Sequence, residues 1–211
     1  SLFQNKTTFN SDISEWDVSN VTNMQNMFLF AHEFSLEYIT GWDVSNVTNM
    51  KGTFYGKTVD VDLTGWDVSN VTRMDYMFEA GGCNGSGDIS TWNTSNVTTF
   101  QGAFANQSAI SCDISNWDVS SAGDFDAMFK NSSFNQDISG WDVSSAWRTS
   151  WMFSNPNFNQ DISNWDISGV TQMTNMFNSA SLSDENQCAI HESFSSNINC
   201  YFHRKYSIHN L

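Results

Sequence analysis

The chain of 211 residues carries a net charge of −15 and contains only eight Lys and Arg residues. This excess of negative charge repels phosphate groups, which excludes nucleic acid as a partner and disfavours anionic lipid surfaces. Hydrophobic residues make up only 39% of the chain, but nine Trp and seventeen Phe supply enough apolar area for a core. No stretch reaches the length of a transmembrane helix, and no signal peptide is visible at Ser1. We expect that a leader has been removed or that the chain is part of a longer protein.

One motif returns along the chain every 24 to 26 residues, and it is built around a tryptophan. An Ile or Leu stands three positions before each Trp, and a Val, Thr or Ile stands two positions after it. The frame Ile-x-x-Trp-x-Val-x-x-Val has the spacing of the leucine-rich-repeat frame, with Trp in the middle slot. The period predicts one elongated α/β solenoid, right-handed and leucine-rich-repeat-like, with seven coils in residues 1–180. The motif tryptophans are Trp16, Trp42, Trp66, Trp92, Trp117, Trp141 and Trp165.

Each coil is predicted to combine a strand with a helical run. The x-Trp-x-Val-x portion predicts a short parallel strand, with Trp and Val pointing inward and the other residues lining a concave surface. The serine three positions after each Trp, such as Ser19, is expected to cap a helix or form a turn. Met24, Met27 and Phe28 follow with the i, i+3, i+4 spacing of a helix face. We expect the Phe slot and the tryptophan row to be core, the latter rather than a sugar-stacking platform.

Two segments interrupt or end the repetition. The glycine-rich residues 81–87 predict a flexible surface loop after the third repeat. Repetition stops near Ala180, and residues 181–211 are expected to form a C-terminal helical cap. An acidic start followed by Ile190 and Phe194 predicts an amphipathic helix that covers the last coil, as solenoids require for solubility.

Four cysteines are present, and an even number permits two disulfides. Cys83 and Cys112 precede consecutive repeat tryptophans, so their loops are expected to be neighbours, while Cys188 and Cys200 share the C-terminal segment. Local pairing in an oxidising compartment is one interpretation, and free buried thiols are the other.

Two stretches carry a family resemblance. They are Phe134-Asn135-Gln136-Asp137-Ile138-Ser139-Gly140-Trp141-Asp142-Val143-Ser144 and Val170-Thr171-Gln172-Met173-Thr174-Asn175-Met176-Phe177. They resemble the BspA-like leucine-rich-repeat surface proteins, specifically the mycoplasma-type surface-protein repeats catalogued as a domain of unknown function. The resemblance covers about residues 7–180 and implies an extracellular or cell-surface protein, often adhesive, without enzymatic activity. It assigns no role to any single residue.

Aspartates form two columns, one four positions before the motif Trp, broken only by Tyr38, and one directly after it, broken only by Asn93. Stacked strands would place equivalent carboxylates about 5 Å apart, where they repel by roughly 3 kcal/mol at an effective dielectric near 20. One interpretation of the second column is a binding strip on the concave face that holds Ca²⁺ or a polar ligand. The other is structural, with carboxylates accepting backbone N–H or Ser hydroxyl bonds from adjacent coils. The strip consists of Asp17, Asp43, Asp67, Asp118, Asp142 and Asp166.

The sixth repeat departs from the pattern and predicts an interaction patch. Trp147 and Trp151 fall on positions occupied by polar residues in the first repeat, so both are expected to point outward beside Arg148. Exposed tryptophans beside arginine are typical of interaction hot spots. Alternatively, a rotated helix buries one of the two rings.

Of the Asn-x-Ser/Thr sequons, those within the repeated Ser-Asn-Val-Thr turn are interpreted as structural. The loop positions Asn84, Asn106 and Asn131 are the glycosylation candidates in a host that glycosylates. The sequence contains no phosphate loop, nucleophile elbow or zinc pattern, so we expect no catalytic residues and no cofactor other than a candidate calcium ion.

These patterns favour a non-enzymatic recognition or adhesion module that is extracellular or on the cell surface. It would bind a protein or a glycan through the aspartate strip or the Trp147 patch. The alternative is a structural subunit of an extracellular assembly or filament, in which copies of the chain stack or are bridged by calcium. A third interpretation is an accessory domain of an enzyme whose catalytic part lies outside these residues.

Overall fold

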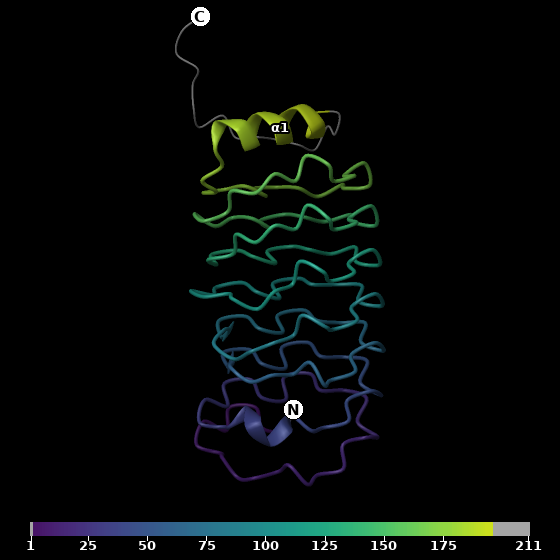
Figure 1. Cartoon of the computed structure of the whole chain (residues 1–211), viewed down its shortest axis with the longest axis vertical. Coiled ribbons are helices and arrows are strands. Elements are labelled where there is room, and N and C mark those ends of the chain that lie inside the picture. The colour runs from purple at the N-terminus through teal and green to yellow at the C-terminus, as the bar shows by residue number, and fades with distance from the viewer. Residues whose placement is uncertain (1, 196–211) are drawn as a thin grey trace, which may run out of the picture.

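The computed structural model of the protein describes residues 2–195, in which the chain forms a tall stack of coils (Figure 1). The N-terminal residues lie at one end of the stack, and helix α1 (Asp184–Phe194) covers the other. Backbone hydrogen bonds join residues one repeat apart, as in the bonds from Met24 to Asn49 and from Met50 to Arg73, both 2.9 Å. The right-handed, leucine-rich-repeat-like class stays a prediction.

Little of the stack is regular secondary structure. Within residues 2–195 the elements are a 3₁₀ helix η1 (Leu36–Ile39), the parallel strands β1 (Thr58–Val59) and β2 (Gly82–Cys83), and helix α1. Isolated parallel bridges form a further column, seven positions after each Trp, which we call the bridge column. It consists of Asn23, Asn49, Arg73, Thr99, Asp124, Arg148 and Gln172.

The prediction of a strand at x-Trp-x-Val-x is therefore wrong. There the backbone N–H groups close turns instead of pairing with the next coil, as in Trp42 to the Ile39 carbonyl (3.1 Å) and Val47 to the Val44 carbonyl (2.9 Å). Asp43 reinforces the turn because its Oδ1 accepts the N–H of Ser45 at 3.0 Å. The apolar spacing of three thus marks the two ends of a β-turn, whose side chains both point into the core.

The prediction of a helical run at Met24 to Phe28 is also wrong. The N–H of Met24 donates to Asn49 of the next coil and that of Phe28 donates to Thr53, while the N–H of Met27 closes a local turn on Met24. Asn26 has φ of +54°, the left-handed conformation found at the third position of type II turns. Since no helix follows Ser19, its predicted capping role is wrong. Its role as a turn former is confirmed, because its N–H and hydroxyl both donate to Asp17.

Aromatic side chains fill the centre of the stack, as predicted. Phe28, Phe54, Phe78, Phe104, Phe129 and Phe153 are fully buried, and only Phe177 in the last coil is partly covered. Six of the seven motif tryptophans are 3–5% exposed. Each of these six donates its indole Nε1–H to the carbonyl three positions before the preceding Trp, as Trp92 does to Leu63 at 2.9 Å.

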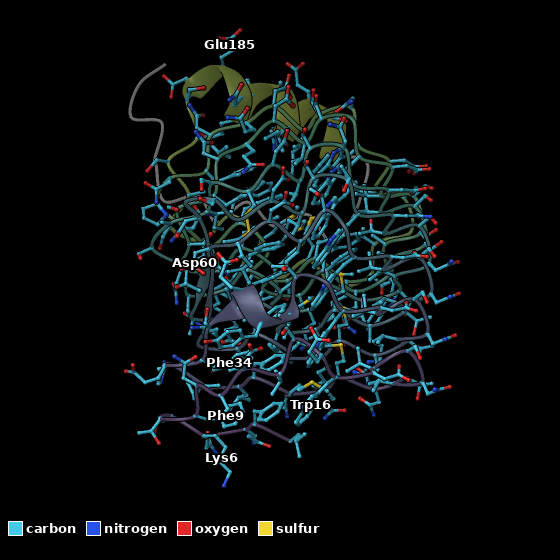
Figure 2. All side chains as sticks on the ribbon, turned by 60° about the horizontal axis from the view of Figure 1, so that its bottom comes forward. Lys6, Phe9, Trp16, Phe34, Asp60 and Glu185 are labelled. Carbon is cyan, nitrogen blue, oxygen red and sulfur yellow. A yellow bond between two sulfur atoms is a disulfide. The ribbon has the colours of Figure 1, made fainter. Side chains whose placement is uncertain are left out.

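Trp16 is the exception, because it is 47% exposed. It belongs to the first coil, and within residues 2–195 no earlier coil covers it or accepts its indole N–H. Figure 2 looks toward this end of the stack and shows Trp16 and Phe9 on it. The prediction of a uniformly buried tryptophan row is wrong at this position.

The glycine-rich segment 81–87 is a surface turn only in part, because Gly85 and Ser86 are exposed whereas the residues before them are not. Gly82 and Cys83 form β2, pair with Thr58 and Val59 of β1, and are buried. Cys83 forms a disulfide with Cys112, which confirms the first predicted pairing. Cys188 is exposed, and its predicted partner Cys200 lies outside the described residues.

The predicted C-terminal helix is confirmed within residues 2–195. The Oγ of Ser183 accepts the N–H of Asn186 at 3.3 Å, and Ile190 and Phe194 are buried. The amphipathic spacing places these two side chains against the last coil. Residues 196–211, the second half of the predicted cap, lie outside the described part of the chain.

Candidate recognition surface

The aspartate strip is exposed along its whole length, and each of its six carboxylates accepts the backbone N–H of the serine two residues later. Oδ1 of Asp43 accepts the hydroxyl of Ser45 at 2.6 Å and its N–H at 3.0 Å. The serine hydroxyl, followed by the serine amide, holds the pKa of the Asp43 carboxyl below its ordinary value. The donors come from the same coil, so the expectation of bonds from adjacent coils is wrong. The pKa is also lowered at Asp17, Asp67, Asp118, Asp142 and Asp166.

The column before each Trp lies at a turn, as predicted, and its aspartates accept the backbone N–H two residues later. An open hollow of about 330 Å³ lies beside this column in the last two repeats. Its lining is entirely polar and consists of Asp137, Ser139, Gln160, Asp161, Ser163 and Asn164. In residues 2–195 no group of three or more His, Cys, Asp or Glu side chains is arranged to hold a metal ion. The calcium site therefore stays a prediction.

Asparagine side chains of the repeated turn, not the aspartates of the strip, join neighbouring coils. In the repeated turn, the Nδ2 of Asn46 donates to the Ser19 carbonyl at 2.8 Å, and that of Asn70 donates to the Ser45 carbonyl at 2.8 Å. These sequons are structural, as interpreted from the sequence. The same applies to two of the glycosylation candidates, whose amides form a ladder from Asn131 to Asn106 (3.1 Å) and from Asn106 to Glu79 (2.9 Å). Asn84, the third candidate, directly follows β2 and is half-buried.

Residues that differ between coils lie on the face that carries the bridge column. We define the variable face as positions six, seven, nine, ten and thirteen residues after each Trp, of which Trp147 is exposed whereas Asp75, Asp126 and Ser150 are buried. In coils three to six, positions seven and nine hold the pairs Arg73 and Asp75, Thr99 and Gln101, Asp124 and Asp126, and Arg148 and Ser150. Sequence reasoning missed this face because its residues lie within the run predicted as a helix. The signal that could have found it is the loss of repetition at these two positions.

Arginine and aspartate form ion pairs along this face. In the third coil, Arg73 forms a bidentate pair with Asp75, with Nε and Nη2 at 3.0 and 3.1 Å from its carboxylate oxygens. Arg148 of the sixth coil contacts two aspartates of the fifth coil. Its Nη2 lies 2.9 Å from Asp126 Oδ2, and its Nη1 lies 3.6 Å from Asp124 Oδ2. Bidentate and paired guanidinium groups are held in fixed orientations, so this polar surface is ordered before any ligand arrives.

The cluster of Arg148, Asp124 and Asp126 is partly buried, and this affects both a pKa and the hydrogen bonding within it. Burial raises the pKa of the Asp124 carboxyl above its ordinary value, although the N–H of Asp126 and the charge of Arg148 oppose the shift. Asp126 is only 9% exposed, and its Oδ1 has no hydrogen-bond partner among residues 2–195. The Nε of Arg148 is likewise buried without a partner in this part of the chain.

The predicted patch of Trp147, Arg148 and Trp151 lies on the variable face, but its three members behave differently. Trp147 is 44% exposed, which confirms that it points outward. Arg148 is directed into the aspartates described above. Trp151 is half-buried, and the Nζ of Lys130 lies 4.5 Å from the centre of its ring. Thr149, which replaces the core Met of other repeats, is buried.

Positive charge concentrates on the same face. Residues 2–195 contain six Lys and Arg residues, and four of them are on the variable face: Lys51, Arg73, Lys130 and Arg148. The rest of the described surface is dominated by the aspartate columns. The face therefore combines tryptophan, tyrosine and arginine on a locally balanced charge, which is the composition of protein interaction surfaces.

No helix within residues 2–195 is both long enough and apolar enough to cross a membrane.

A family model described as "Mycoplasma protein of unknown function, DUF285" matches residues 1–84 and 80–190. The two matches together cover the stack of coils and most of α1. No curated protein and no solved structure matches the chain. The chain belongs to the mycoplasma family of unknown function that this model describes.

Proposed function

We propose that the protein is a non-enzymatic recognition or adhesion module of the cell surface or extracellular space, and that it binds its ligand through the variable face. The observation that carries the proposal is the contrast between this face and the rest of the molecule. The core, the turns and both aspartate columns repeat from coil to coil, whereas positions seven and nine change in each of coils three to six. In repeat proteins the constant positions build the scaffold, which leaves the variable surface to determine specificity.

Two further observations support the location. The resemblance to BspA-like surface proteins implies an extracellular or surface role. The disulfide between Cys83 and Cys112 is favoured in an oxidising compartment.

The regular aspartate strip is less suited to a specific ligand. Its six carboxylates are in equivalent surroundings, and each already accepts a hydrogen bond from a serine in its own turn. A ligand bound there would find the same side chains in almost every coil, and would therefore bind in several registers.

The test is binding of the labelled protein to arrays of immobilised extracellular proteins and glycans. Three forms are compared: wild type, a variable-face variant (Trp147→Ala with Arg73→Ala) and a strip variant (Asp43→Asn with Asp142→Asn). We expect saturable binding by wild type, retained by the strip variant and lost or at least tenfold weaker in the face variant. Equal loss in both variants, or loss only in the strip variant, would contradict the proposal.

A second candidate function is a structural subunit of an extracellular assembly, for which the exposed N-terminal end of the stack is the specific observation. Leu2 is 60% exposed and Trp16 47% exposed at this end, whereas α1 covers the opposite end. Within residues 2–195, the first coil thus offers apolar side chains that could pack against a further coil or a second copy. Sedimentation velocity with calcium and with excess chelator tests this candidate, since it requires concentration-dependent dimers. Dimers that form only with calcium would favour bridging by the aspartate strip.

A further inference from the structure

The aromatic rings of the variable face differ in what lies on them. The Nζ of Lys51 lies 5.4 Å from the ring centre of Tyr76, and that of Lys130 lies 4.5 Å from the ring centre of Trp151. Both are intramolecular cation–π pairs. Trp147 is the most exposed ring of the three, and no lysine or arginine within residues 2–195 lies over it. Its neighbour Arg148 is turned away and held by Asp124 and Asp126.

The surroundings of Trp147 are adapted to hold the ring in the open. Position six is Thr in the first four coils and in the last, but it is Gly123 in the fifth coil and Trp147 in the sixth. A Cβ at Gly123 would lie 2.6 Å from Cδ1 and 2.7 Å from Nε1 of the indole, so only glycine leaves room for this ring position. The backbone N–H of Trp147 also donates to the Gly123 carbonyl at 2.9 Å. Gly123 in the fifth coil therefore leaves the space that the Trp147 ring of the sixth coil occupies.

A second column changes in the same coils. Two positions before position six, the first four coils carry asparagines, and those of the second to fourth coils donate to the preceding coil, as Asn96 does. The last three coils carry Ser121, Ser145 and Gly169 at this position, and all three are exposed. The fifth to seventh coils therefore have no asparagine to form this bond between coils.

The charge around this ring favours a cation. Asp124 is adjacent in sequence to Gly123, on which the ring rests, and Arg148 balances only one of the two carboxylates of Asp124 and Asp126. The strip residues Asp118 and Asp142 belong to the same two coils and have no basic partner among residues 2–195. A net charge of −15 adds long-range attraction for a basic ligand.

We propose that Trp147 is the receptor for a lysine or arginine side chain on a basic segment of a partner protein. This deepens the proposed function and rests on it. The incoming cation would occupy the open face of the indole, as Lys51 and Lys130 occupy their rings within the molecule. The carboxylates of the fifth and sixth coils would supply the electrostatic attraction. Tryptophan binds cations more strongly than tyrosine or phenylalanine, which would account for Trp at a position that is Thr in five of the seven coils.

The experiment follows the indole N–H signals of the ¹⁵N-labelled protein during titration with hexa-arginine and hexa-lysine peptides. The Trp147 signal is assigned from the Trp147→Ala spectrum. Trp16→Ala is the matched control, because Trp16 is equally exposed but lies at the N-terminal end. We expect the Trp147 signal to shift on titration with either peptide. Affinity should fall roughly two- to fivefold in Trp147→Ala, fall less in Trp147→Phe, and remain unchanged in Trp16→Ala.

Two results would overturn the inference. In the first, the peptides bind Trp147→Ala as tightly as wild type, which would show that they are attracted only by the aspartate columns. In the second, maltohexaose shifts the Trp147 signal whereas the peptides do not, so that the ring stacks on a glycan. In either case the proposed function is judged separately on the arrays. Saturable array binding that depends on the variable face would leave that function standing while the cationic partner is rejected.

Discussion

Replacing Trp92 by phenylalanine should destabilise the stack by about 2 kcal/mol, because two separate contributions are lost. The indole Nε1–H donates to the Leu63 carbonyl of the preceding coil at 2.9 Å in a buried setting, and such a bond contributes about 1 kcal/mol. Phenylalanine is also smaller by roughly 40 Å³, and a cavity of that size costs about 1 kcal/mol. The phenyl ring can still stack on Trp66 and Trp117, whose ring centres lie 6.3 and 6.2 Å away, so the stacking is largely kept.

The assay is urea unfolding followed by circular dichroism, with Trp16→Phe as the matched control. Trp16 makes no indole bond to a preceding coil within residues 2–195 and is 47% exposed, so its replacement should cost less than about 0.5 kcal/mol. For a chain of this size, 2 kcal/mol corresponds to a fall in Tm of about 4–8 °C. Equal effects of the two substitutions would refute the conclusion that buried indoles join successive coils.

Three further predictions concern the disulfide, the stability of the fold at acid pH and the Trp147 site. Cys83→Ser should lower the free energy of unfolding by about 3–4 kcal/mol, since the disulfide closes a loop with a sequence separation of 29. Reduced wild type should unfold like the variant. A free energy of unfolding that reduction leaves unchanged would contradict this. The strip aspartates have lowered pKa values in the folded state, as Asp43 has, so their stabilisation is present above about pH 4 and is lost as pH falls through the lowered pKa values. Urea midpoints that stay constant from pH 6 to pH 3 would contradict this sign. Gly123→Ala should displace the Trp147 indole and shift its N–H signal. It should destabilise the fold by less than about 1 kcal/mol, because the added methyl group would clash with a flexible, exposed side chain. An unshifted signal would show that the ring does not rest on Gly123.

The sequence identified the core correctly because burial follows the repeat. The spacing predicts Ile13, the Val and Phe slots and the tryptophan row as core, and these side chains are buried except Trp16 and the partly buried Val21 and Phe177. The same spacing misled the assignment of secondary structure. Apolar residues three apart face the same side in a helix, but they also face the same side at the two ends of a β-turn. Only the hydrogen bonds distinguish the two: the N–H groups of Met24 and Phe28 donate to the next coil, and that of Met27 closes a turn on Met24.

The candidate site was harder to predict, for a related reason. Its charge and regular spacing make the aspartate strip a candidate ligand site in the sequence. That regularity instead follows from a turn in which Asp43 accepts two hydrogen bonds from Ser45. The outward direction of Trp147 followed correctly from its position in the repeat. The ion pairs of Arg148 could not be predicted, because they join side chains on different coils and depend on how the stacked backbones align.

The central claim is that the variable face, rather than the aspartate strip, contacts the ligand. Footprinting of the protein bound to the array component that retains it tests this most directly, with hydroxyl radicals for aromatic rings and a carbodiimide for carboxylates. The account predicts that oxidation of Trp147 and Tyr76 falls on binding, whereas modification of Asp43 and Asp67 is unchanged. Protection of the strip carboxylates with Trp147 still fully oxidised would contradict it.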